Sequence, residues 1–248
     1  MDESAIFEIF EGLPRQGPGS NECTEKAFGL IAPQPSGSKI LDIGCGVGMQ
    51  TLHLASICNN CHITAIDIYQ PYLDKLMEHA VEKGFADRIS TVCASMEELP
   101  FEEDEFDVIW ADGSIFIIGF EKGLSYWKRF LKKGGFLALT EAAWFSGTPS
   151  EEVFKFWQEC YPSITSILEY EKMIEVAGYS IVGRFKLPAS AWWDDYYVPM
   201  EKRLKDIEGK YRGNADGKSV IEFSRKEMEI FRKHSDEYGY VFFVLQKR

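Results

Sequence analysis

The feature that most constrains this chain is an apolar run followed by a glycine-rich turn. Residues 39–43 read Lys-Ile-Leu-Asp-Ile, and Gly44, Gly46 and Gly48 follow them. The run predicts a buried strand, and the glycines predict a sharp turn whose backbone can approach a ligand closely. A helix is expected after the turn. This arrangement is typical of a nucleotide-like cofactor site at the carboxyl end of a parallel strand.

The glycine spacing indicates which ligand fits. A dinucleotide site requires Gly-x-Gly-x-x-Gly, because a pyrophosphate must sit on the helix N-terminus. Here the third glycine comes one residue early, and Asp42, two residues before the first glycine, would repel phosphate. A ligand without phosphates, carrying an ammonium and a sulfonium, fits better.

A carboxylate at the end of the next strand strengthens this interpretation. Sites of this type place an acid about 20 residues further on, where it holds the ribose hydroxyls. The run His62–Asp67 predicts a strand that closes in Asp67 at that distance. The glycines alone would be weak evidence for a cofactor site, whereas the glycines together with Asp67 are strong evidence for one.

Together with two later segments, these residues resemble the class I S-adenosylmethionine (SAM) dependent methyltransferases. Residues 91–101 are similar to the family's third-strand motif ending in Leu-Pro-Phe, and residues 106–113 to its fourth strand and loop. The resemblance is strongest to the branch with ubiquinone- and menaquinone-biosynthesis-type enzymes. Residues 13–20 and 110–120 resemble a narrower group of small bacterial and archaeal methyltransferases of unassigned substrate.

The resemblance implies a SAM site with a role for each matching residue. The glycines line the methionine and ribose, and Asp67 takes the ribose hydroxyls. The expected adenine neighbours are Ile68, Ser95 and Met96. Ser95 stands where many relatives carry an acid.

Three charged residues are expected near the methionine end of the cofactor. Asp42 would act through water or backbone, and Asp112, just past the fourth strand, would contact the methionine moiety or the substrate. Arg15 would bind the cofactor carboxylate or an acidic substrate; the alternative is an exposed guanidinium on a turn.

Substrate and catalytic residues are less clearly marked, because methyl transfer depends mainly on alignment. No catalytic base is identified, with Glu141 and Asp112 as the candidates. Trp144 and Phe145 follow the fifth strand, where the family often contacts substrate. Trp192, Trp193, Tyr196 and Tyr197 are expected to form a lid over a planar or cationic substrate; the alternative is that they pack the insertion onto the core.

The alternation of strand and helix patterns predicts an α/β fold with a doubly wound, mostly parallel sheet of seven strands, Rossmann-like and with a helical insertion. The expected parts are an N-terminal cap over residues 1–35, a SAM-binding core over 36–187, a partly helical lid insertion over 188–239 and a last strand over 240–248. Resemblance to the family implies that this last strand runs antiparallel beside the fifth. Within the insertion, Ser224 to Glu227 is interpreted as a capping box that begins a helix.

Composition narrows the function classes. A net charge of −12 disfavours a nucleic-acid partner, which would need Lys and Arg. No run approaches the length of a membrane span, and the N-terminus begins with acids, so a cytoplasmic protein is expected, as monomer or homodimer. The six cysteines are expected to be reduced thiols. Cys58 and Cys61 have CxxC spacing, but a turn is favoured over a metal or redox site, and no metal is expected.

The residues therefore predict an enzyme that transfers methyl from SAM to a small-molecule acceptor. Two alternatives stay open. One is a non-catalytic SAM-binding or interaction protein on the same fold. The other is a NAD-dependent dehydrogenase, which the glycine spacing and the absence of a Tyr-x-x-x-Lys pair in a suitable helix oppose.

Overall fold

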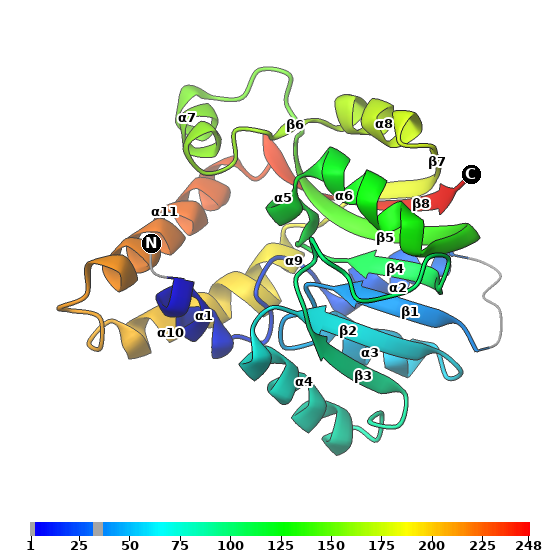
Figure 1. Ribbon diagram of the computed structural model, residues 1–248. Coiled ribbons are helices and arrows are strands. Elements are labelled where there is room, and N and C mark those ends of the chain that lie inside the picture. The colour runs from blue at the N-terminus through cyan, green and yellow to red at the C-terminus, as the bar shows by residue number, and fades with distance from the viewer. Residues whose placement is uncertain (1–2, 32–36) are drawn as a thin grey trace.

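A twisted, mostly parallel sheet forms the centre of the molecule (Figure 1). The computed structural model describes residues 3–31 and 37–248. The strand order is β3-β2-β1-β4-β5-β8-β7, with a short β6 beside β5. The strands are β1 Lys39–Ile43, β2 His62–Asp67, β3 Ile89–Cys93, β4 Phe106–Ala111, β5 Leu131–Trp144, β6 Thr165–Ser166, β7 Tyr179–Lys186 and β8 Tyr238–Lys247.

The direction of the strands confirms the predicted doubly wound fold. β1 pairs in parallel with β2 and β4, and β4 pairs in parallel with β5. The last strand, β8, lies antiparallel between β5 and β7. The two-residue β6 adds an eighth strand to the seven that were predicted. Because β1 and β4 lie at the point where the strand order reverses, their carboxyl ends border the crevice in which such folds bind ligands.

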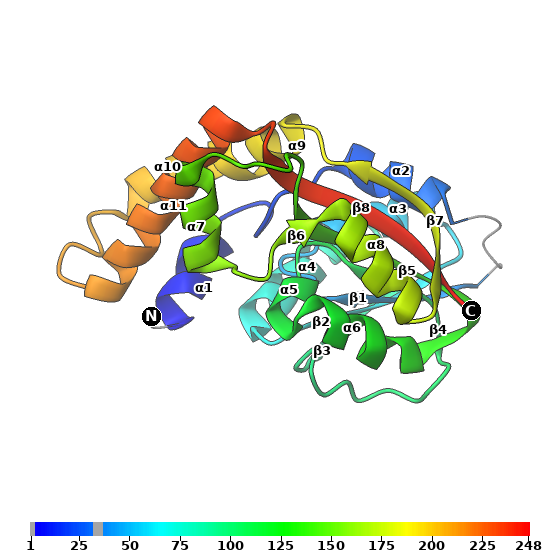
Figure 2. The same cartoon turned by 90° about the horizontal axis from the view of Figure 1, so that it is seen from above.

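Helices cover both faces of the sheet, and a third group lies beyond one end of it (Figure 2). One face carries α2 Asn21–Gly29, α3 Met49–Ile57 and α4 Gln70–Glu82, and the other carries α5 Ile115–Ile118, α6 Phe120–Trp127 and α8 Ile167–Val176. The third group consists of α1 Glu3–Glu11, α7 Glu151–Cys160, α10 Val198–Ile207 and α11 Ala215–His234. The short α9 Ser190–Trp192 and the π-helical turn η2 Trp193–Tyr197 lead into α10.

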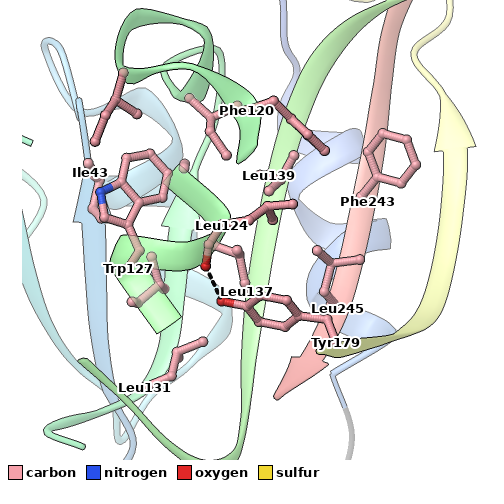
Figure 3. Packing of buried hydrophobic residues seen from close by; sticks show 14 of the residues in the cluster. Ile43, Phe120, Leu124, Trp127, Leu131, Leu137, Leu139, Tyr179, Phe243 and Leu245 are labelled. Atoms are coloured by element: carbon pink, nitrogen blue, oxygen red, sulfur yellow. Dashed lines mark hydrogen bonds between the residues drawn. The ribbon is translucent and has the colours of Figure 1, made fainter. Parts of the chain in front are cut away.

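Apolar side chains on the α6 and α8 face form one continuous core (Figure 3). Leu137 and Leu139 of β5 pack there with Trp127, Phe243 and Leu245. The Tyr179 hydroxyl donates to the Leu124 carbonyl at 3.1 Å, so this buried hydroxyl has a hydrogen-bond partner. This packing fixes the end of β4 and the middle of β5, next to the glycine turn.

One predicted helix start was wrong. Ser224 lies in the middle of α11, and its hydroxyl donates to the Val220 carbonyl one turn earlier, at 2.9 Å. The helix begins at Ala215, where the Asn214 side chain accepts from the Gly217 N–H. The apolar pattern of α11 continues through Ser224, so a Ser-x-x-Glu pattern inside a helix imitated a capping box.

The expectation that all six cysteines are thiols was also wrong. Cys58 and Cys61 form a disulfide across the turn between α3 and β2, with Cα atoms 5.5 Å apart. Arg88 donates to the Cys58 carbonyl and holds the same turn. The remaining four cysteines are free: Cys23, Cys45, Cys93 and Cys160.

The predicted domain boundaries stay a prediction, and the one between residues 35 and 36 lies outside the described residues. α1 contacts both α10 and α11, and Arg232 of α11 forms an ion pair with Glu201 of α10, so the N-terminal helix and the insertion join in one layer (Figure 1). Within the described ranges, no helix has both the length and the apolar character needed to cross a membrane.

Candidate functional site

The glycine turn connects β1 to α3 at the carboxyl edge of the sheet. Gly44, Gly46 and Gly48 have φ values of +70°, +56° and +84°, a region that side chains with a Cβ rarely adopt. A Cβ on Gly44 would lie 2.7 Å from Ser114 Cβ, and one on Gly48 would overlap Leu76 Cδ1. Both the conformation and the close neighbours therefore require glycine.

The N-terminal segment is fastened to this turn by Gln16, which sequence reasoning did not single out. Its Oε1 accepts from the Val47 N–H at 2.9 Å, and its Nε2 donates to the carbonyls of Phe10 and Leu13. A Cβ on Gly46 would overlap the same Oε1. Residues 13–20 did stand out in the sequence through their resemblance to a group of methyltransferases. Within that segment Arg15 was predicted to bind a ligand, and the adjacent Gln16 was not.

Asp67 lies at the end of β2 and faces the turn. Its Oδ2 accepts from the Gly46 N–H and its Oδ1 from the Tyr69 N–H, both at 3.0 Å. Burial raises the pKa of Asp67, while these N–H groups lower it. Each oxygen keeps a second lone pair, so Asp67 can still accept from a ligand hydroxyl.

Residues predicted to flank adenine lie beyond Asp67. Ile68 is 65% exposed at the end of β2, in spite of its apolar side chain. Ser95 accepts from the Glu97 N–H at 3.2 Å through its Oγ, so its hydroxyl supports a turn. The Met96 carbonyl accepts from Trp127 Nε1, and its methyl lies 3.5 Å from the position of a Cβ on Gly44. The structure thus brings Met96 to the glycine turn.

A pocket opens between the N-terminal segment and the glycine turn. It is lined by Arg15, Gln16, Gly17, Pro18, Gly44, Cys45, Gly46, Gln50, Asp112 and Gly113. Two of these residues, Arg15 and Asp112, carry opposite charges. The pocket therefore offers a ligand both a cationic and an anionic group.

Arg15 is buried rather than exposed on a turn. Only 4% of it is accessible; its Nη1 lies 3.7 Å from Asp112 Oδ2, and its Nη2 donates to Asn21 Oδ1 at 3.3 Å. Its Nε is buried and makes no hydrogen bond within the described part of the chain, but it forms a long ion pair with Asp195 Oδ2 at 4.0 Å. A guanidinium N–H that makes no hydrogen bond next to a pocket can donate one to a ligand anion.

Asp112 is held by Thr140, a residue that the sequence did not mark. Thr140 Oγ1 donates to Asp112 Oδ1 at 2.8 Å and accepts from the Gly113 N–H at 2.7 Å. Burial raises the pKa of Asp112, and the charge of Arg15 lowers it. Oδ2 lies 3.7 Å from Arg15 Nη1 and forms the anionic edge of the pocket.

Asp42 lies behind the pocket and does not line it. Thr51 Oγ1 donates to Asp42 Oδ2 at 2.5 Å, and Gln50 Nε2 approaches Oδ1 at 3.5 Å. Burial raises the pKa of Asp42 to about 7, although these two hydrogen bonds lower it. Gln50 does line the pocket, so Asp42 orients the start of α3 and reaches the ligand site only through Gln50.

The aromatic segment of the insertion divides into buried and partly exposed rings. Trp192 is stacked on Phe231 of α11 with centroids 4.3 Å apart, and Tyr197 is buried with its hydroxyl donating to Glu227 Oε1 at 2.8 Å. Contacts of this kind are expected under the alternative that these aromatic residues pack the insertion onto the core. Tyr196 is buried beside Tyr197, whereas Trp193 is partly exposed under Arg232, 4.9 Å from the ring.

After β5, the two predicted substrate residues differ in their surroundings. Trp144 is partly exposed and packs near Phe154 and Trp157 of α7. Phe145 packs against Gly239 and lies under the ammonium of Lys186, 3.8 Å from its ring centre. Their role toward a substrate stays a prediction.

The catalytic candidate Glu141 is buried on β5 and points to the opposite face of the sheet from Thr140. Burial raises the pKa of Glu141 to about 8. Among the described residues, no group of three or more His, Cys, Asp or Glu side chains is arranged to hold a metal ion.

Known proteins are similar to this chain in both sequence and fold. Residues 40–135 match the family described as Methyltransferase domain. A phosphoethanolamine N-methyltransferase from Triticum aestivum is 26% identical over 77% of this chain and 36% of the relative. A sarcosine/dimethylglycine N-methyltransferase from Aphanothece halophytica is 28% identical over 60% of this chain and 54% of the relative.

A solved structure extends the similarity over the whole fold. It is a SAM-dependent methyltransferase from Geobacter sulfurreducens in complex with S-adenosyl-L-homocysteine, with a TM-score of 0.83, 21% identity and 98% coverage of both chains. This chain spans only about a third to a half of the length of the two curated relatives. The predicted placement near ubiquinone- and menaquinone-biosynthesis enzymes stays a prediction.

Proposed function

We propose that this chain, whose residues 40–135 match the Methyltransferase domain family, is a SAM-dependent methyltransferase that transfers the methyl group of SAM to a small-molecule acceptor. The observation that carries the proposal is the pocket between Arg15 and the glycine turn. The Arg15 Nε–H without a hydrogen bond, the Asp112 carboxylate and the close backbone of the glycine turn match an amino acid end rather than a phosphate. A dinucleotide would bring a pyrophosphate to Asp112 and Asp67.

The residues present fit SAM at each of its parts. Arg15 Nε would donate to the α-carboxylate, and Asp112 Oδ2 would accept from the α-ammonium. Asp67 would accept from the ribose hydroxyls, and the exposed Ile68 would cover one face of the adenine. Met96 would contact the ring from the side of the glycine turn.

In the proposed reaction the cofactor provides the reactive methyl group, and the protein positions the acceptor. When bound, SAM would supply an electrophilic methyl group for an acceptor lone pair, with a neutral thioether as the leaving group. The protein aligns the acceptor and excludes water. Glu141 is the group proposed to take a proton from the acceptor, because its raised pKa lies near neutrality. Asp112 is proposed to hold the cofactor, since Arg15 and Thr140 fix both its oxygens.

The acceptor is proposed to be a small molecule and not a nucleic acid, because the chain has a net charge of −12. Partly exposed aromatic residues, Trp144 and Trp193, are the proposed contacts for its apolar part. Trp192 and Tyr197 would act indirectly, since they anchor η2 on α11.

Turnover tests the proposal. Purified protein is incubated with SAM and pools of small amines, alcohols, thiols and carbanion-forming acids, and S-adenosylhomocysteine is quantified by mass spectrometry. Product that accumulates only with an acceptor pool supports methyl transfer. If the protein binds SAM yet no pool yields product above the buffer control, the non-catalytic alternative is favoured.

A further inference from the structure

The connection that follows β5 is held in place by a short turn before β8. Residues 145–150 connect β5 to α7. The N–H groups of Phe145 and Ser146 both donate to the Glu237 carbonyl, at 2.7 and 3.0 Å. The Ser150 N–H donates to the side chain of the same glutamate, at 2.5 Å from Oε2. One residue therefore anchors both ends of the connection.

His234, the last residue of α11, joins this glutamate to α7. Its Nδ1 lies 2.8 Å from Glu237 Oε1, and its Nε2 lies 3.2 Å from Glu152 Oε2. Glu152 is the second residue of α7, so the imidazole bridges carboxylates from two different elements. The ring is 19% exposed, which lets it exchange protons with solvent. We call Glu152, His234 and Glu237 the His234 clamp.

The charge of the imidazole decides how many of these bonds exist. A carboxylate only accepts hydrogen bonds, so each ring nitrogen must carry a hydrogen to pair with its glutamate. The imidazolium has both N–H groups, whereas the neutral ring has one and would turn a lone pair toward the second carboxylate. Loss of a single proton from His234 therefore removes one charge-assisted hydrogen bond. The longer contact, to Glu152, is the one expected to open.

Neighbouring charges favour the protonated form. Burial lowers the pKa of His234, but the hydrogen bonds and charges of Glu237 and Glu152 raise it above its usual value. The position at the C-terminus of α11 also favours a cation. Lys233 approaches the same Glu152 at 3.6 Å and pairs with Glu229 at 2.8 Å. The proton should thus leave His234 at a higher pH than it leaves an exposed histidine.

The anchored connection borders the acceptor side of the site. Trp144 lies on the same face of β5 as Thr140, which holds Asp112, and four residues place it about 13 Å further along the strand. Its ring packs near Phe154 and Trp157 of α7. A movement of α7 would therefore change the aromatic surface around Trp144.

We propose that His234 is a positioning residue that acts as a pH-dependent clamp on the acceptor side of the site. In its charged form it fastens α7 to Glu237, and in its neutral form it releases Glu152 and the start of α7. This inference rests on the proposed methyl transfer, in which Trp144 contacts the acceptor. Among the described residues, none that lines the cofactor pocket belongs to the His234 clamp, so cofactor affinity should not follow the charge of His234.

A histidine titration by NMR tests the clamp in the whole, unmodified protein. The imidazole Cε1–H resonances are followed from about pH 5 to about pH 9, and His234→Gln assigns the resonance of His234. We expect His234 to titrate above the ordinary value of about 6.5. Glu152→Gln should lower the pH at which His234 titrates, because it removes one of the two carboxylates that favour the imidazolium.

Hydrogen exchange shows whether this proton holds α7. The measured quantity is the protection factor, which corrects for the intrinsic pH dependence of exchange. We expect the protection of the Ser150 and Phe154 amides to fall about tenfold as pH rises through the titration of His234, in line with the loss of a hydrogen bond to a charged group. In His234→Gln this protection should be low and independent of pH. His62→Gln, which removes an exposed histidine at the start of β2, is the matched control and should behave as the wild type.

Kinetic constants separate a positioning role from a structural one. In the turnover assay, the acceptor pool that yields product is titrated at a fixed pH below the titration of His234. His234→Gln should raise the KM for the acceptor and leave kcat and the affinity for S-adenosylhomocysteine unchanged. A general loss of structure would instead lower all three.

The outcomes distinguish this inference from the proposed function. A His234 resonance that titrates at or below about 6.5 would overturn the clamp, whether or not any variant folds. Protection of α7 in folded His234→Gln that equals the wild type at low pH would do the same, as would an unchanged KM for the acceptor. Failure of S-adenosylhomocysteine to bind the wild type would contradict the proposed function, while the NMR and exchange results would still decide whether the clamp exists.

Discussion

At the scale of single residues, the site depends on positions where only one side chain fits. Gly48 combines a φ of +84° with contact to Leu76, and Gly46 makes room for Gln16. Arg15 has the opposite character, because its guanidinium is buried and its Nε–H makes no hydrogen bond among the described residues. The glycine positions support the fold, whereas the Arg15 guanidinium is available to bind a ligand.

Replacing Gly48 by alanine should destabilise the protein. The left-handed backbone costs about 1–2 kcal/mol, and the overlap with Leu76 adds about 1–3 kcal/mol. Urea unfolding measures the sum. Gly147→Ala, where the added Cβ meets open space, is the matched control. Equal stabilities for the two variants would show that the turn is not built as described.

Replacing Arg15 by alanine should weaken binding of S-adenosylhomocysteine by about 1.5–3 kcal/mol, the value of a hydrogen bond to a charged group. Fluorescence titration gives the dissociation constant. Arg129→Ala, which removes an exposed arginine paired with Glu103, should leave it unchanged. Unchanged affinity in Arg15→Ala would remove this residue from the cofactor site.

The raised pKa of Asp42 should make the free energy of unfolding depend on pH. Its folded pKa of about 7 exceeds an unfolded value of about 3.9, so the folded state binds more protons between these values. The contribution of Asp42 to stability is therefore largest below about pH 4 and falls as pH rises to 7. Stability of the wild type minus that of Asp42→Asn should decline over this window by about 4 kcal/mol, at about 1.4 kcal/mol per pH unit. A pH-independent difference would contradict the assignment.

At the scale of elements, local patterns predicted strands well and some helix limits badly. The run 39–43 and the acid Asp67 predicted β1, the glycine turn and β2 in their observed order, because each element's signal lies within its own residues. Thr140 and Gln16 were missed because they act through partners 28 and 31 residues away. The Cys58–Cys61 disulfide was missed because CxxC spacing occurs equally in turns and metal sites.

Two variants test the corrected start of α11, which lies at Ala215 and not at Ser224. Asn214→Ala should destabilise the protein by about 1 kcal/mol, since Asn214 caps the helix. Ser224→Ala should change stability by less, because its hydroxyl only bonds back to its own helix. Thermal unfolding of both variants decides between them, and a larger loss for Ser224→Ala would restore the capping box.

At the scale of the whole molecule, the fold assembles the site from distant parts of the chain. The glycine turn, the N-terminal segment and the end of β4 form the pocket. α1 packs with α10 and α11, so the two regions outside the core meet beyond the sheet (Figure 2). The sequence could predict the core from its motifs, but this meeting depends on tertiary packing that no local pattern records.

The measurement that tests the central claim most directly is calorimetric titration of ligand-free protein with S-adenosylhomocysteine, beside NAD under the same conditions. The account predicts saturable heat with a dissociation constant on the order of micromolar for S-adenosylhomocysteine, and none for NAD. Heat from NAD alone, or silence from S-adenosylhomocysteine in a folded sample, would contradict it.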